Sequence, residues 1–95
     1  MITESKFQTR LIQRIVKLFP LCIILKNDPN YIQGIPDLLI LNGNKWAALE
    51  IKKNKNATRR PNQRYYVEVM DHMSYATTVY PENMEEVLDE LQQAL

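Results

Sequence analysis

Two short apolar runs in the middle of the chain constrain its fold more than any other feature. The runs cover residues 37–41 and 45–52, and only Asn42-Gly43-Asn44 separates them. Asn-Gly between apolar runs is the strongest short-range signal for a β-hairpin, because both residues tolerate a positive φ. The sequence therefore predicts an antiparallel hairpin at the centre of the molecule.

Helical and extended patterns alternate on either side of this hairpin. Apolar residues recur at helical spacing behind Thr3, the candidate N-cap, and again in the last third of the chain. The predicted elements are a helix over 3–18, a buried strand over 21–25, the hairpin, a helix over 61–73, a strand over 75–80 and a helix over 82–95. The second helix is expected to bury Tyr66, Val69, Met70 and Met73. The order αβββαβα predicts an α/β domain with a central mixed sheet, and 95 residues suit a single domain over 1–95.

Composition excludes several classes of protein. Cys22 is the only cysteine, so an intrachain disulfide and a cysteine-based zinc site are both excluded. The chain has no apolar run near the roughly 18 residues of a membrane span and no secretory signal, so we expect a soluble protein of the cytoplasm, with no membrane partner. With only two glycines it lacks a glycine-rich phosphate loop, which disfavours a nucleotide cofactor.

Charge is distributed unevenly along the chain although its net value is only +1. Residues 1–64 hold all 12 basic residues and four acids, whereas residues 65–95 hold seven acids and no Lys or Arg. A dense basic cluster suits a phosphate backbone, and the alternative is a solvated loop that aids solubility. The acidic C-terminal part is expected to pack on, or pair with, the basic half. The cluster comprises Lys52, Lys53, Lys55, Arg59, Arg60 and Arg64.

Three ionisable residues interrupt the apolar hairpin strands. Glu50 and Lys52 are two residues apart, so they share one face of their strand. A two-residue loop would pair Asp37 with Ala48 and a four-residue loop would pair it with Glu50, and both registers put all three groups on one side. A three-residue loop without a bulge would put Asp37 on the other side.

Two carboxylates beside an ammonium suit a hard divalent cation such as Mg²⁺ or Mn²⁺, which prefers oxygen ligands and often binds substrate phosphate as well. In this hypothesis Asp37, Glu50 and the backbone carbonyl of Ile51 hold the metal. Lys52 acts on the attacking water, and the basic cluster holds the strand that is cut. The alternative is an edge strand on which Glu50 and Lys52 simply face water.

The segments Gly34-Ile35-Pro36-Asp37 and Glu50-Ile51-Lys52 resemble the PD-(D/E)xK nuclease superfamily, and within it the stand-alone VRR-NUC domains of phages and bacteria. The resemblance implies a restriction-endonuclease-like domain with an αβββαβ core and a C-terminal helix. It also implies that Gln63 lies near the catalytic lysine and that Glu4 completes the metal shell. Thr58-Arg59-Arg60 is not equated with the Val-Arg-Arg signature of the family.

The resemblance further implies hydrolysis of DNA phosphodiesters with Mg²⁺ or Mn²⁺, a branched or four-way junction substrate, and a homodimer. Lys53, Lys55, Arg59, Arg60 and Arg64 are the expected DNA contacts, and Tyr65 is a candidate contact to a base. Two alternatives remain at this point. One is a non-catalytic nucleic-acid-binding module that uses the same basic loop, and the other is a phage accessory protein that docks a host partner through its acidic helix.

Overall fold

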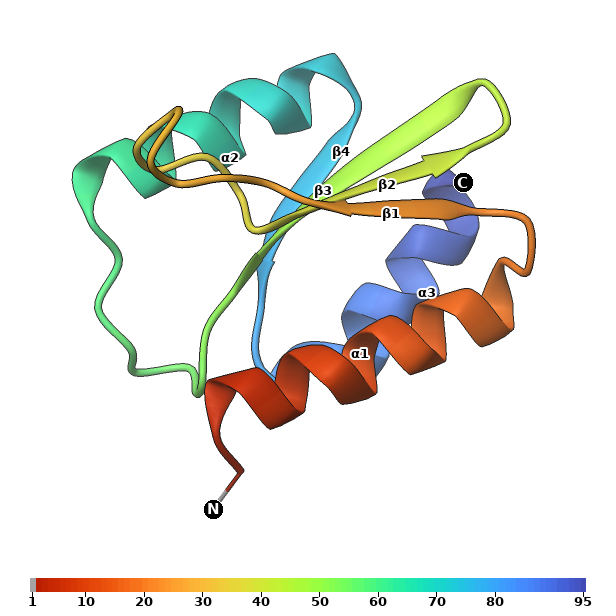
Figure 1. Ribbon diagram of the computed structural model, residues 1–95, viewed down its shortest axis with the longest axis horizontal. Coiled ribbons are helices and arrows are strands. Elements are labelled where there is room, and N and C mark those ends of the chain that lie inside the picture. Colours follow the sequence, from red (N-terminus) through yellow and green to blue (C-terminus); the bar gives the residue numbers. More distant parts are fainter. Residues whose placement is uncertain (1) are drawn as a thin grey trace.

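The computed structural model describes residues 2–95 and has three helices around a four-stranded sheet (Figure 1). Helices α1 and α3 cover one face of the sheet, and α2 lies on the other (Figure 1). Among the described residues, no helix is long and apolar enough to cross a membrane. The elements are α1 (Glu4–Leu18), β1 (Ile23–Lys26), β2 (Leu38–Asn42), β3 (Lys45–Ile51), α2 (Pro61–Met73), β4 (Tyr75–Val79), the short 3₁₀ helix η1 (Pro81–Asn83) and α3 (Met84–Ala94).

The sheet is mixed, as the sequence predicts. Its strand order is β1-β2-β3-β4; β1, β2 and β3 pair antiparallel, and β4 runs parallel to β3. A parallel pair needs a crossover connection, and α2 supplies it between β3 and β4. The α/β fold predicted from the order of elements is therefore confirmed.

The hydrophobic core lies between the sheet and the helix pair α1 and α3. Phe7, Leu11 and Ile15 from α1 meet Leu88 and Leu91 from α3 over the buried strand residues of the same face. The Thr3 hydroxyl accepts a hydrogen bond from the Lys6 amide at 3.1 Å, which makes Thr3 the N-cap as expected. Arg14 of α1 also forms a bidentate pair with Glu85 of α3 at 2.8 Å, so the basic and acidic parts of the chain meet here.

The hairpin register settles the face on which the charged residues lie. Leu38 pairs with Leu49 and Asn42 pairs with Lys45, so the next position outward pairs Asp37 with Glu50. This is the register assigned above to a four-residue loop, but pairing continues to Asn42–Lys45 and leaves only Gly43-Asn44 in the turn. Gly43 has φ +64°, as the first central position of a type II′ turn requires.

Two predicted burial patterns are wrong. The strand expected to be buried over 21–25 is the edge strand β1, in which Ile23 is 58% exposed and Leu25 is 44% exposed. In α2 no residue is fully buried, and Met73, expected in its buried stripe, is 68% exposed. The third helix is also split, because η1 precedes α3. Helices α1 and α3 bury residues in the core, whereas α2 has no fully buried residue and stays partly accessible to solvent.

Candidate active site

Asp37 and Glu50 meet at one end of the hairpin, on the face that α2 covers. Asp37 directly precedes β2, and its Oδ2 accepts a hydrogen bond from the Ile51 amide at 2.7 Å. The Asp37 side chain thus continues the β2–β3 ladder by one step beyond the last backbone pair, Leu38–Leu49. This hydrogen bond fixes the Asp37 carboxylate beside the end of β3, where Glu50 is located.

Glu50 is a buried carboxyl group without a hydrogen-bond partner on one of its oxygens. Its side chain is only 3% exposed, and among the described residues its Oε2 is the one buried side-chain oxygen or nitrogen that lacks a partner. Burial, followed by the hydrogen bond and the charge of Asp37, raises the pKa of Glu50 to about 9, while the Lys52 ammonium acts in the opposite direction. Two acids that cannot easily ionise together, with an unsatisfied oxygen, suit a bound cation.

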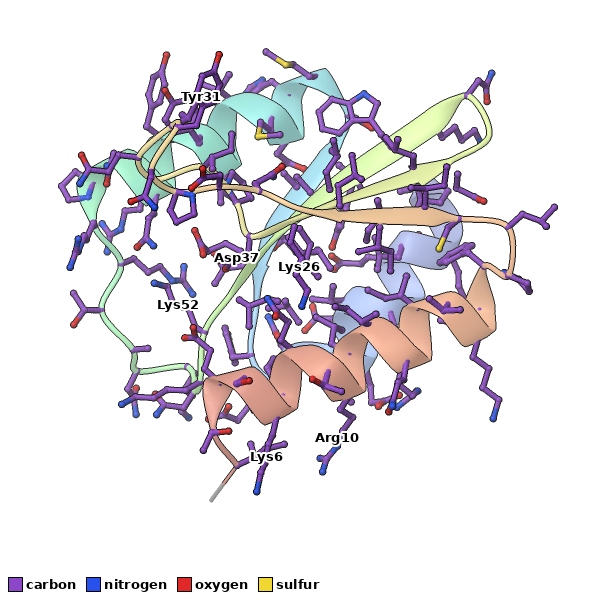
Figure 2. All side chains as sticks on the ribbon, viewed as in Figure 1. Lys6, Arg10, Lys26, Tyr31, Asp37 and Lys52 are labelled. Carbon is purple, nitrogen blue, oxygen red and sulfur yellow. The ribbon has the colours of Figure 1, made fainter. Side chains whose placement is uncertain are left out.

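Lys52 is held in place by Gln63. The Lys52 ammonium donates to Gln63 Oε1 at 3.0 Å, and the same oxygen accepts the Arg60 backbone amide at 3.0 Å. Gln63 therefore caps the first turn of α2 and orients the lysine at the same time. The proximity of Gln63 to Lys52, implied by the family resemblance, is present in the structure. Figure 2 shows Asp37 and Lys52 extending into the area enclosed by the 52–60 loop.

Glu4 lies at the start of α1 and does not complete a three-acid cluster. Its charge still contributes to the raised pKa of Glu50, so Glu4 is within electrostatic reach of the pair. Within residues 2–95, no group of three or more His, Cys, Asp or Glu side chains is placed to hold a metal ion. The available donor set is two carboxylates and the nearby Ile51 carbonyl, which fits Mg²⁺ or Mn²⁺ because these ions keep several waters.

The predicted DNA contacts are all exposed, but they do not all lie equally near the acids. Arg59 and Arg64 line a pocket of about 330 Å³ that also contains Glu50 and Gln63. Arg60 is the N-cap of α2, and Lys53 lies in the loop that follows β3. The Lys55 amide faces Glu82 at 3.4 Å, which ties the outer part of this loop to the C-terminal end of the sheet.

Two residues that support the site were not identified from the sequence. Asn27, assigned there only to a turn, donates its side-chain amide to the Pro36 carbonyl at 2.8 Å, and its backbone amide to the Asp37 carbonyl at 2.9 Å. Gly34 has φ +90°, and a Cβ at this position would lie 2.7–3.0 Å from Asn62 atoms. Both residues fix the segment that carries Asp37, and Gly34 lets this segment approach α2 next to Gln63.

Comparison with known proteins identifies the fold of this chain. No family model matches the sequence, and no curated protein matches it significantly. Two solved structures are similar. One, described as a VRR_NUC domain, has a TM-score of 0.72 at 19% identity and covers 90% of this chain and 94% of its own. The other, a VRR_NUC domain protein, has a TM-score of 0.72 at 22% identity and covers 100% of this chain and 89% of its own. The resemblance read from the sequence is confirmed at the level of the fold.

Proposed function

We propose that this chain, which has the fold of VRR-NUC domains, is a metal-dependent DNA endonuclease formed by a single domain over residues 1–95. One observation carries the proposal: the buried Glu50 carboxyl has an unpartnered oxygen, lies against Asp37 and is near the Lys52 ammonium. A buried carboxyl group beside a second carboxyl group is costly to ionise, and strongly perturbed acids of this kind cluster at functional sites.

In this proposal Asp37, Glu50 and the Ile51 carbonyl hold one Mg²⁺ or Mn²⁺ ion. When bound, such an ion supplies Lewis-acid activation of a phosphate oxygen and lowers the pKa of water. Asp37 is kept in place by the Ile51 amide, and a bound cation would favour the deprotonated form of Glu50.

Lys52 is the proposed catalytic side chain. Its ammonium, oriented by Gln63, stabilises negative charge that develops at the scissile phosphate and orients the attacking water. In the reaction the water oxygen forms a new P–O bond while one ester P–O bond of the backbone breaks. Glu4 is proposed to act on the site through its charge, as an outer acid of the metal shell rather than as a direct ligand.

The basic residues around the site are proposed to bind the DNA backbone. All five are exposed and follow the end of β3, and a phosphate chain that contacts Arg59 and Arg64 passes Glu50, which lines the same pocket; the five are Lys53, Lys55, Arg59, Arg60 and Arg64. We further propose branched or four-way junction DNA as substrate and a homodimer as the active form. The proposed location is the cytoplasm of a bacterium or of a phage-infected cell.

A cleavage assay on linear, flapped and four-way DNA tests this proposal. We expect wild-type protein to cut in Mg²⁺ or Mn²⁺ and not in EDTA, and Asp37→Asn and Glu50→Gln to lose cutting. Asp89→Asn, an exposed acid of α3 on the opposite face, is the matched control and is expected to cut like wild type. Binding of these DNAs without cleavage under any metal would favour the non-catalytic module instead.

A further inference from the structure

A pocket of about 330 Å³ extends from the acid pair along α2 towards the edge strand β4. Glu50 and Gln63 lie at its inner end, since Glu50 is buried, and the exposed Arg59 and Arg64 lie nearer its opening. Thr77 and Thr78 of β4 form the opposite wall. The outer part of the pocket, lined by Val67, Glu68 and Asp71, has no role in the chemistry assigned above to Asp37, Glu50 and Lys52.

A second hollow of about 420 Å³ continues the first towards solvent. It shares Arg59, Arg64 and Glu68 with the first pocket and adds Tyr65. The Tyr65 ring is 59% exposed, and an edge-to-face contact with Tyr66, at 5.2 Å between ring centroids and 80°, holds it. The two hollows together, here named the α2 groove, lead from Glu50 to an exposed, oriented aromatic ring.

The lining of the α2 groove matches a nucleotide rather than a bare phosphate. Arg59 and Arg64 can pair with backbone phosphates, but the carboxylates of Glu68 and Asp71 would repel them. Carboxylates do accept hydrogen bonds from the exocyclic amines of bases. Val67 and Ala76 add apolar surface, and the Tyr65 ring offers a stacking partner. Cationic side chains beside an aromatic ring on which a base can stack are recurring features of single-strand binding sites.

The size of the groove excludes a double helix. Pockets of roughly 300–1,000 Å³ take small-molecule-sized groups, and the inner pocket is at the lower end of that range. A base inside a duplex is paired and stacked between its neighbours, so it cannot enter a pocket of this size while it remains in the double helix. A base must leave the stack or be unpaired before it can reach Glu68 or Tyr65.

We propose that the α2 groove binds an unpaired DNA strand adjoining the scissile phosphate, with Arg59 and Arg64 at its phosphates and a base stacked on Tyr65. This inference rests on the proposed nuclease function. It identifies the part of the DNA by which the protein recognises its substrate. The strand that passes Glu50 continues as a single strand along α2, so DNA with unpaired nucleotides beside the cut is preferred over continuous duplex.

Binding of two DNAs to the Lys52→Ala protein tests the groove without cleavage. One is a blunt duplex, and the other is the same duplex with a single-stranded tail that carries the fluorescent base 2-aminopurine. We expect tighter binding of the tailed DNA, with quenched tail fluorescence. Adding Tyr65→Ala should lower affinity for the tailed DNA by about 5- to 150-fold, the range for loss of one stacked base, and leave the blunt duplex unchanged.

Two further variants make this result specific. Tyr65→Phe keeps the ring and should keep the preference for the tail. Tyr31→Ala is the matched control, because Tyr31 is 84% exposed and lines neither hollow of the groove. Equal affinity for both DNAs, or equal loss in the Tyr65→Ala and Tyr31→Ala proteins, would overturn the groove assignment.

Cleavage of both DNAs by wild-type protein in Mn²⁺ separates this inference from the proposed function. If wild type cuts the blunt duplex and the tailed DNA at equal rates, and the tail adds no affinity, the groove assignment fails and the nuclease stands. If wild type cuts neither DNA although Tyr65 still selects the tail, the nuclease proposal fails and strand binding in the groove stands.

Discussion

At Lys52, an effect on the cleavage rate can be separated most easily from an effect on DNA affinity. Its ammonium is held at Gln63 Oε1, whereas the neighbouring Lys53 is exposed in the loop. We expect Lys52→Ala to lower the single-turnover cleavage rate by about 10²–10⁴-fold with little change in DNA affinity. Lys53→Ala should weaken DNA binding and leave the saturated rate unchanged. A Lys52→Ala protein that cuts at the wild-type rate would exclude the catalytic role of this lysine.

Glu50 makes the stability of the metal-free protein depend on pH. Its pKa is about 9 in the folded chain against an ordinary value of 4.5, so between these values the folded chain holds more protons than the unfolded chain. The contribution of Glu50 to stability is therefore expected to be full below the lower value and to be lost as pH rises towards the upper one.

Urea midpoints measured across this pH range check the expectation. The Glu50→Gln protein lacks the titrating group, so its midpoint should fall less with pH than that of wild type. Saturating Mn²⁺ should restore the wild-type midpoint at the alkaline end, because the cation binds the deprotonated pair. Identical pH slopes in the two proteins would mean that Glu50 is not the buried acid described.

At the scale of elements, the contact between Gly34 and α2 couples the Asp37 segment to the Lys52 support. A Cβ on Gly34 would come within 2.7 Å of Asn62 Cγ and 2.9 Å of the Asn62 backbone carbon, one residue before Gln63. Gly34→Ala should cost about 1–3 kcal/mol of stability, since it combines a positive φ with this overlap.

The same substitution should also reduce cleavage, because α2 must move and take Gln63 with it. Chemical denaturation and single-turnover cleavage measure the two effects. Gly43→Ala is the matched control: Gly43 also has a positive φ, but nothing lies within 4 Å of the added Cβ. It should be destabilised through backbone strain alone and retain its cleavage rate. Equal loss of cleavage in both proteins would rule out the Asn62 contact as the cause.

The elements could be predicted from sequence where the signals are local. Thr3 and the apolar spacing define α1, and Asn42-Gly43-Asn44 defines the hairpin, because caps and turns depend on a few adjacent residues. The exposure of β1 could not be predicted, since a strand's place at the sheet edge depends on pairing with the whole sheet. Likewise, the burial of the apolar stripe of α2 could not be predicted. Helical spacing shows which residues share a face, but it does not show how closely that face packs.

The candidate site was predictable to a similar degree. Asp37, Glu50 and Lys52 stand out as charges within apolar strands, and two of three loop lengths place them on one face. The observed register, with Asp37 opposite Glu50, needed the structure. The supporting contacts of Asn27 and Gly34 could not be predicted, although Gly34 belongs to the segment that carries the resemblance, because these contacts to Pro36 and Asn62 join separate parts of the chain.

At the scale of the whole molecule, charge divides the chain into a basic part over residues 1–64 and an acidic part over residues 65–95. The Arg14–Glu85 pair is exposed and contributes little to stability, as is usual for surface ion pairs. The loop cations are expected to matter for binding instead. Arg59→Ala should weaken DNA affinity and reduce the slope of log affinity against log salt by about 1. Lys17→Ala, at the far end of α1, should leave the slope unchanged.

The number of sites per chain sets an expectation for the assembly. Each chain carries one Asp37–Glu50 pair, so symmetric cutting of two strands requires two copies. We expect wild type mixed with excess Lys52→Ala protein to nick four-way DNA in one strand, and sedimentation to give a dimer. Cleavage of both strands by a sedimenting monomer would contradict the proposed homodimer.

The binding of Mn²⁺ by the protein alone tests the pairing of Asp37 and Glu50 most directly. A calorimetric titration at neutral pH should give one ion per chain for wild type and for the exposed-acid control Asp89→Asn. Glu50→Gln should weaken this binding by about tenfold or more, since it removes a ligand. Equal Mn²⁺ affinity in the wild-type and Glu50→Gln proteins would contradict a metal centre at this acid pair.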